Sequence, residues 1–295
     1  MNELKGLGVA MITPFTKAGE VDVPALKKLT DHLVTGGADY LVVMGTTGES
    51  VTLNKEERKL VLDTVMACNN GRKPIVLGIG GNNTQDIAAQ LSRLETHGIS
   101  AILSVTPYYN KPTQNGLYEH YKALSESSKL PIILYNVPGR TGVNLLPDTV
   151  SRIAFDCRNV IGIKEASGNV EQVMAVIQQT PKEFMVISGD DALTLPLIAS
   201  GADGVISVVG NAFPKEFSEM VHHALNNEMD QARAIHYRLL DIIHLLFTEG
   251  NPAGIKEVLD QLNICEHYLR LPLVPVSHTT SEKLRHEMID QGFLS

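Results

Sequence analysis

The stretch PIILYNVPGRTGVNLLPDTVSRIAFDCRNVIGIKEA, residues 131–166, contains two short apolar runs with a helical pattern between them. The runs are PIILYNV (131–137) and VIGIKEA (160–166), and the helical pattern covers residues 147–155. Runs that are apolar at nearly every position are typical of parallel strands buried on both faces. The stretch therefore predicts a strand–helix–strand unit of a parallel sheet.

The same unit recurs on both sides of this stretch. Eight apolar runs occur in the chain, at residues 6–12, 39–45, 74–80, 101–107, 131–137, 160–166, 184–190 and 204–210. The helical patterns lie at residues 24–36, 55–68, 84–97, 116–128, 147–155, 170–179, 192–200 and 214–226. Eight parallel strands with short crossovers close most simply into a (β/α)8 barrel, the TIM-barrel fold.

An open, doubly wound sheet is the alternative fold. It normally carries a glycine-rich phosphate loop after its first strand, whereas the first run here ends in Thr13-Pro14-Phe15. The glycines after the third run lack the GxGxxG spacing, so they favour tight packing over a dinucleotide site. We therefore predict the barrel.

Strands and helices stop alternating after the eighth helical pattern. Three further helical patterns follow, at residues 229–247, 252–263 and 279–291. We predict two regions: a catalytic barrel at residues 1–226 and a small C-terminal helical region at residues 227–295.

Composition narrows the class of partner. The net charge is −8, with the charges scattered, which disfavours nucleic acid and anionic membranes because both require a basic surface.

Three distant cysteines without a CxxC pair favour a reducing compartment, and no apolar run is long enough for a signal peptide or a membrane helix. We expect a cytoplasmic protein. The ten histidines show no metal-binding spacing, so no metal site is predicted.

Lys164 is the strongest candidate for a catalytic residue. Barrel enzymes carry their active sites at the C-terminal ends of the strands, and Lys164 lies there, after the uncharged residues 160–163. Burial favours the neutral form of an amine, which is a nucleophile suited to imine formation with a carbonyl substrate. The alternative interpretation is an ion pair with Glu165 or with an Asp of the next strand.

Two groups near the preceding strand end favour the chemical interpretation. Tyr135 is expected beside Lys164, where a phenol can transfer protons during imine formation; the alternative is a rim tyrosine in contact with water. Arg140 lies on a glycine-flanked loop and is suited to binding a carboxylate through two hydrogen bonds. Its alternative is a solvated surface arginine.

The segment Gly45-Thr46-Thr47-Gly48-Glu49-Ser50 follows the second run. Adjacent backbone amides and threonine hydroxyls between glycines form an anion-binding nest, which suits the carboxylate of a 2-oxo acid. The alternative is the first turn of the following helix.

Six motifs together resemble the dihydrodipicolinate synthase family over nearly the whole chain. They are GTTGES (45–50), TPYYN (106–110), YNVPGRTG (135–142), GIKEA (162–166), SGDD (188–191) and GVISV (204–208). The resemblance implies condensation of pyruvate with aspartate 4-semialdehyde in the diaminopimelate route to lysine, without a cofactor beyond the enzyme-bound imine.

The resemblance also implies a role for each matching residue. Lys164 would form the imine, Tyr135 would relay protons, and Thr46 would be the hydrogen-bonded partner of that tyrosine. Tyr109 matches a tyrosine that a neighbouring subunit inserts into the site. A homodimer at least, and usually a tetramer built as a dimer of dimers, is implied.

Substrate-binding roles follow from the same motifs. Thr47 would bind the pyruvate carboxylate, Arg140 the semialdehyde carboxylate, and the backbone of Gly189 and Ile206 would line the pocket. Other pyruvate-dependent aldolases, such as N-acetylneuraminate lyase and 2-oxo-3-deoxy sugar acid aldolases, share the lysine and tyrosine. Arg140 favours the synthase over these, and an inactive binding barrel is the alternative from a non-enzyme class.

The family also has a feedback site for lysine. The matching positions are Ser50, Val51, Lys55, Arg58, Asn82, Asp86 and Tyr108. Lys55 and Arg58 stand where inhibited members carry histidines, and two cations would repel the ammonium of lysine. We predict weak or absent inhibition by lysine.

Overall fold

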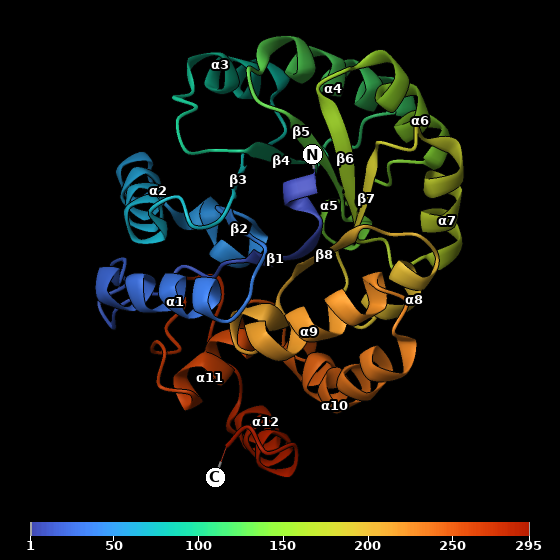
Figure 1. Cartoon of the computed structure of the whole chain (residues 1–295). Coiled ribbons are helices and arrows are strands. Elements are labelled where there is room, and N and C mark those ends of the chain that lie inside the picture. The colour runs from blue at the N-terminus through green and yellow to red at the C-terminus, as the bar shows by residue number, and fades with distance from the viewer. Residues whose placement is uncertain (1, 295) are drawn as a thin grey trace.

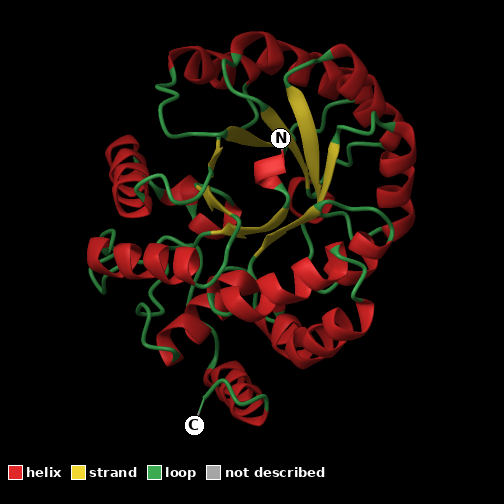
Figure 2. Cartoon of the chain, viewed as in Figure 1, coloured by secondary structure: helices red, strands yellow, loops and turns green. Residues whose placement is uncertain are grey.

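The computed structural model describes residues 2–294 and confirms the predicted barrel. Its strands close in sequence order from β1 to β8, with parallel pairing throughout (Figures 1 and 2). The strands are β1 (Gly6–Ala10), β2 (Tyr40–Val43), β3 (Ile75–Gly78), β4 (Ala101–Val105), β5 (Ile132–Asn136), β6 (Val160–Glu165), β7 (Met185–Ser188) and β8 (Gly204–Ser207). Each lies within one of the eight apolar runs.

The helices form a ring outside the strands (Figure 2). They are α1 (Val23–Thr35), α2 (Lys55–Asn69), α3 (Thr84–Arg93), α4 (Gln114–Ser127), α6 (Pro147–Asp156), α7 (Val170–Gln179), α8 (Thr194–Ala199) and α9 (Pro214–Leu225). Helix α2 begins with a capping box, in which Asn54 and Glu57 exchange side-chain and backbone hydrogen bonds.

Helix α3 is shorter than the sequence predicted. It ends at Arg93 rather than near His97, because Leu94 adopts an extended conformation with φ −64° and ψ 130°. Leu94 packs against the apolar core in this position. Burial of the leucine thus accompanies the early end of the helix.

The interior of the barrel is filled by side chains from alternate strand positions. The inward-facing cluster contains residues of β1 to β8, including Tyr40, Leu103, Tyr135 and Ile206. Leu4, from the short helix η1 (Asn2–Leu4), joins the same cluster and closes the N-terminal end of the barrel. The barrel is a packed core, and its open rim is the C-terminal end of the strands.

The C-terminal region packs against the last part of the barrel. It comprises α10 (Met229–Phe247), α11 (Ala253–Gln261) and α12 (His278–Asp290), with α10 against α8 and α9 (Figure 1). Apolar side chains of these helices belong to the same outer core as the barrel helices. Within residues 2–294, no helix combines the length and the apolar character needed to cross a membrane.

Candidate active site

Lys164 lies at the C-terminal end of β6 and points into the barrel. It is directly opposite Tyr135 in the register of β5 and β6, and its Nζ lies 4.4 Å from the centre of the Tyr135 ring. Lys164 is only 6% exposed, so its amine is largely removed from water. The structure therefore brings these two side chains together at the rim.

Glu165 points the opposite way, since adjacent residues of a strand face opposite sides. Its carboxylate accepts hydrogen bonds from Asn136 (2.9 Å), from Gln172 of α7 (3.1 Å) and from the N–H of Ser167 (2.8 Å). Glu165 is therefore engaged outside the barrel. This removes one of the ion-pair partners considered for Lys164.

The aspartates of the next strand end are also engaged elsewhere. Asp190 accepts from the N–H groups of Ala192 and Leu193, which places it at the turn before α8. Asp191 accepts from the N–H groups of Val208 and Val209 at 3.0 and 2.8 Å. Burial raises the pKa of Asp191 to about 6, while these N–H donors oppose the rise.

Gly189 brings the end of β7 close to the amine. A Cβ at this position would lie 3.1 Å from Cε of Lys164 and 2.6 Å from Cβ of Ala166, so a larger residue would press on the lysine. Ile206 is 1% exposed and faces the same interior as Tyr135. Gly189 thus lies beside Lys164, and Ile206 lies in the interior cluster of the barrel.

The GTTGES loop (residues 45–50) follows β2 and forms the short helix η2 (Thr46–Gly48). Thr46 is exposed and Thr47 is buried. Asn251 donates to Oγ1 of Thr47 at 3.0 Å, which leaves the threonine's own hydroxyl hydrogen free to donate. A substrate carboxylate is a suitable acceptor for it.

Arg140 and Tyr109 are exposed, like Thr46. Arg140 is in the short helix α5 (Pro138–Thr141), and its side chain is open to solvent. Tyr109 is 85% exposed and adopts a positive φ of 74°, which is uncommon for a bulky residue. Neither side chain is fixed by the fold of one chain, in contrast to Lys164.

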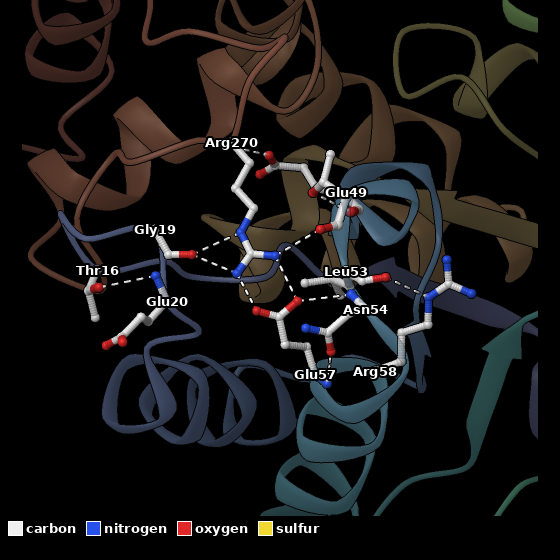
Figure 3. A network of polar contacts seen from close by, with 10 residues as sticks. Thr16, Gly19, Glu20, Glu49, Leu53, Asn54, Glu57, Arg58 and Arg270 are labelled. Carbon is white, nitrogen blue, oxygen red and sulfur yellow. Dashed lines mark hydrogen bonds and ion pairs between the residues drawn. The ribbon is translucent and has the colours of Figure 1, made fainter.

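The sequence reasoning missed three residues of the C-terminal region that contact the GTTGES loop: Asn251, Lys256 and Arg270. We call them the C-terminal clamp. Lys256 forms an ion pair with Glu49 at 2.6 Å, with side chains 0% and 1% exposed. Figure 3 shows the guanidinium of Arg270 between Gly19 and Glu57. One signal was present: Lys256 lies in an apolar helix, just as Lys164 ends an apolar strand.

The predicted regulatory positions form two contacting groups. Arg58 donates to the carbonyl oxygens of Ser50 (2.9 Å) and Leu53 (3.1 Å), so its guanidinium supports the chain after η2. Asn82 donates to the carbonyl oxygen of Tyr108 at 3.4 Å. The remaining positions lie on or near these segments, namely Val51, which is exposed, Lys55 at the start of α2, and Asp86, which accepts from Asn83.

Within residues 2–294, no group of three His, Cys, Asp or Glu side chains is arranged to hold a metal ion.

Comparison with known proteins gives a consistent family. The dihydrodipicolinate synthetase family matches residues 3–291. Proteins named 4-hydroxy-tetrahydrodipicolinate synthase are 51% identical in Flavobacterium psychrophilum, over 96% of this chain and 97% of that protein, and 54% identical in Parabacteroides distasonis, over 96% and 95%. The structure of chloride-inhibited dihydrodipicolinate synthase from Acinetobacter baumannii complexed with pyruvate superposes with a TM-score of 0.95 at 40% identity, covering 99% of this chain and all of that one.

Proposed function

The chain belongs to the dihydrodipicolinate synthetase family, and we propose on that basis that it condenses pyruvate with aspartate 4-semialdehyde through an imine on Lys164. The product is 4-hydroxy-tetrahydrodipicolinate, in the diaminopimelate route of lysine biosynthesis. The observation that carries the proposal is the pairing of Lys164 with Tyr135 inside the barrel rim. Both relatives carry the synthase name, so the other aldolases and an inactive barrel are not favoured.

The first half of the reaction forms the imine. The neutral amine of Lys164 attacks the ketone carbon of pyruvate, and the carbinolamine loses water. Tyr135, whose ring lies beside the amine, is assigned to transfer the protons that this step moves, with Thr46 as its partner toward the solvent. Thr47 and the backbone amides of the GTTGES loop hold the pyruvate carboxylate.

The second half makes the carbon–carbon bond. Loss of a methyl proton converts the imine to an enamine, whose carbon attacks the aldehyde carbon of the semialdehyde. Cyclisation through the substrate's amino group then displaces Lys164 and regenerates the free amine. No cofactor is needed, because the iminium nitrogen accepts the electron pair.

Arg140 is assigned to the carboxylate of the semialdehyde. Its guanidinium is exposed at the rim and can donate two parallel hydrogen bonds to a carboxylate. Gly189 and Ile206 line the floor beneath the substrates.

A second copy of the chain completes the site in this proposal. The exposure and positive φ of Tyr109 support its insertion into the site of a neighbouring subunit. We assign a homo-oligomer, organised as a dimer of dimers, in the cytoplasm where the lysine precursors are made. The lysine-binding cleft around Lys55 and Arg58 stays a prediction, with weak or absent inhibition expected in a steady-state assay.

Imine trapping tests the central step. The protein is incubated with pyruvate, reduced with borohydride, and digested for peptide mapping by mass spectrometry. The added mass is expected on the peptide that contains Lys164. Label on another lysine, or on none, would overturn the proposal, and consumption of pyruvate only in the presence of aspartate 4-semialdehyde identifies the acceptor.

A further inference from the structure

The GTTGES loop is held in an unusual backbone conformation. Met44 before the loop and Glu49 within it have φ values of 63° and 50°, in the left-handed region that L-residues with side chains rarely adopt. Such conformations persist only where the surrounding structure enforces them. Glu49 sits directly between η2 and η3 (Ser50–Thr52), so its backbone sets the direction of the segment that contains Thr46 and Thr47.

Both carboxylate oxygens of Glu49 are held by the C-terminal region. Oε1 lies 2.6 Å from Nζ of Lys256, and Oε2 accepts from the backbone N–H of Arg270 at 3.1 Å. Lys256 itself donates to the carbonyl oxygen of Tyr268 at 2.8 Å and lies 4.2 Å from the ring centre of Phe15. A buried ion pair of this kind has a fixed geometry, because both charges are removed from water.

The side chain of Arg270 holds the segment that follows the GTTGES loop. Its guanidinium makes five hydrogen bonds, which match the five N–H donors of the group: two to the carbonyl oxygen of Gly19, one to that of Thr52 and two to the carboxylate of Glu57. Thr52 ends η3 and Glu57 belongs to the capping box of α2. The guanidinium therefore joins the loop after β1 to the segment that follows the GTTGES loop.

The C-terminal clamp contacts the GTTGES loop and the segment that follows it at three points. Asn251 contacts Thr47 directly, Lys256 contacts Glu49, and Arg270 contacts the segment beyond it. We propose that Lys256, through Glu49, and Arg270, through the segment that follows the GTTGES loop, are positioning residues that set the affinity for the carboxylate of pyruvate, although neither touches the substrate. The inference rests on the proposed function, since it takes the GTTGES loop as the site of that carboxylate.

The test removes the ion pair without leaving a lone charge. Glu49→Gln/Lys256→Met keeps the side-chain volumes similar and eliminates both charges, so the fold is expected to survive. The half-saturating concentration of pyruvate should rise roughly ten- to a hundredfold, because a displaced loop binds the carboxylate less well. The value of kcat should fall by a smaller factor than the half-saturating concentration of pyruvate rises, because the main loss is in binding while Thr46 shares the displaced loop. The KM for the semialdehyde should change by less than about threefold.

A matched control separates positioning from general destabilisation. Val258→Ala creates a cavity beside the same helix, α11, at a fully buried position. Val258 lies two residues after Lys256 and so faces the other side of the helix. This variant should leave the half-saturating concentration of pyruvate unchanged. Arg270→Lys, which keeps the charge but loses the paired hydrogen bonds, should raise that concentration less than Arg270→Met does.

The possible outcomes are distinct. The inference is overturned if Glu49→Gln/Lys256→Met binds pyruvate within about twofold of the wild type, or if Val258→Ala shows the same rise. Borohydride trapping of the wild type with pyruvate is run alongside. If the wild type takes no label on Lys164, the proposed function fails; if it is labelled and the double variant is unchanged, only the positioning inference fails.

Discussion

Two buried lysines, Lys164 in β6 and Lys256 in α11, occupy opposite electrostatic settings. Lys164 lies against the ring of Tyr135, with Glu165 turned to the outside of the barrel. Lys256 lies against the carboxylate of Glu49, and burial lowers its pKa while the attraction of Glu49 opposes that effect. The same residue type is thus suited to a reactive amine in one place and to an anchor in the other. The position of the nearest carboxylate distinguishes the two settings: it points away from the amine of Lys164 and lies beside the amine of Lys256.

The strongest test of this contrast is the loss of Lys164. Lys164→Met should lower kcat/KM by at least about a thousandfold and abolish borohydride trapping of pyruvate, since the nucleophile is gone. Urea unfolding should show no loss of stability, because an amine without an ion-pair partner is replaced by an apolar side chain. Residual trapping on this variant would mean that another amine carries the chemistry.

The opposite result is expected for Lys256. Lys256→Met alone leaves Glu49 buried without its partner and should lower the free energy of unfolding by about 3–5 kcal/mol. The urea midpoint of this variant is compared with that of Glu49→Gln/Lys256→Met, which should recover most of the loss. If the single variant is as stable as the wild type, Lys256 is not an anchor and the contrast between the two lysines is wrong.

A third variant tests whether Arg140 binds the second substrate. Arg140→Ala should weaken the use of aspartate 4-semialdehyde by about 1.5–3 kcal/mol in kcat/KM, because the substrate carboxylate loses its charged hydrogen-bond donors. Imine formation with pyruvate should be retained, as measured by borohydride trapping. An equal loss in both measurements would show that Arg140 supports the loop rather than binding the second substrate.

Acid should weaken the contact between Arg270 and Glu57. The hydrogen bonds from Arg270 lower the pKa of Glu57 to about 2 from an ordinary value near 4.5. Glu57 therefore contributes stability that is present above pH 4.5 and is lost as the pH falls toward 2. Arg270→Met should reduce the slope of stability against pH in that window, measured by chemical unfolding at each pH. An unchanged slope would show that this pair does not contribute.

The two lysines also show what the sequence could predict. Lys164 and Tyr135 were predictable because both end adjacent parallel strands, and the repeated strand–helix unit fixes their register. Glu49 and Arg270 are separated by 221 positions in the sequence, and no local pattern selects that pairing. The helix ends agree with the sequence to within two residues except in α3, where burial of Leu94 ends the helix early.

Lys256 meets the same sequence criterion as Lys164. A lysine within an apolar segment requires either a partner or a function, and this rule drew attention to Lys164. The sequence PAGIKEVL around Lys256 meets the same condition. The rule finds such residues, but only the tertiary structure shows whether a carboxylate faces them.

The clamp also makes the order of synthesis matter. A chain made from its N-terminus releases the GTTGES loop early, when the first strands can already begin to pair. Its three anchors, Asn251, Lys256 and Arg270, are synthesised about 200 residues later. Lys164 and Tyr135 can therefore be in register before the GTTGES loop has its final shape. Under the proposed function, the carboxylate site is complete only when α11 and the segment around Arg270 have docked on the GTTGES loop.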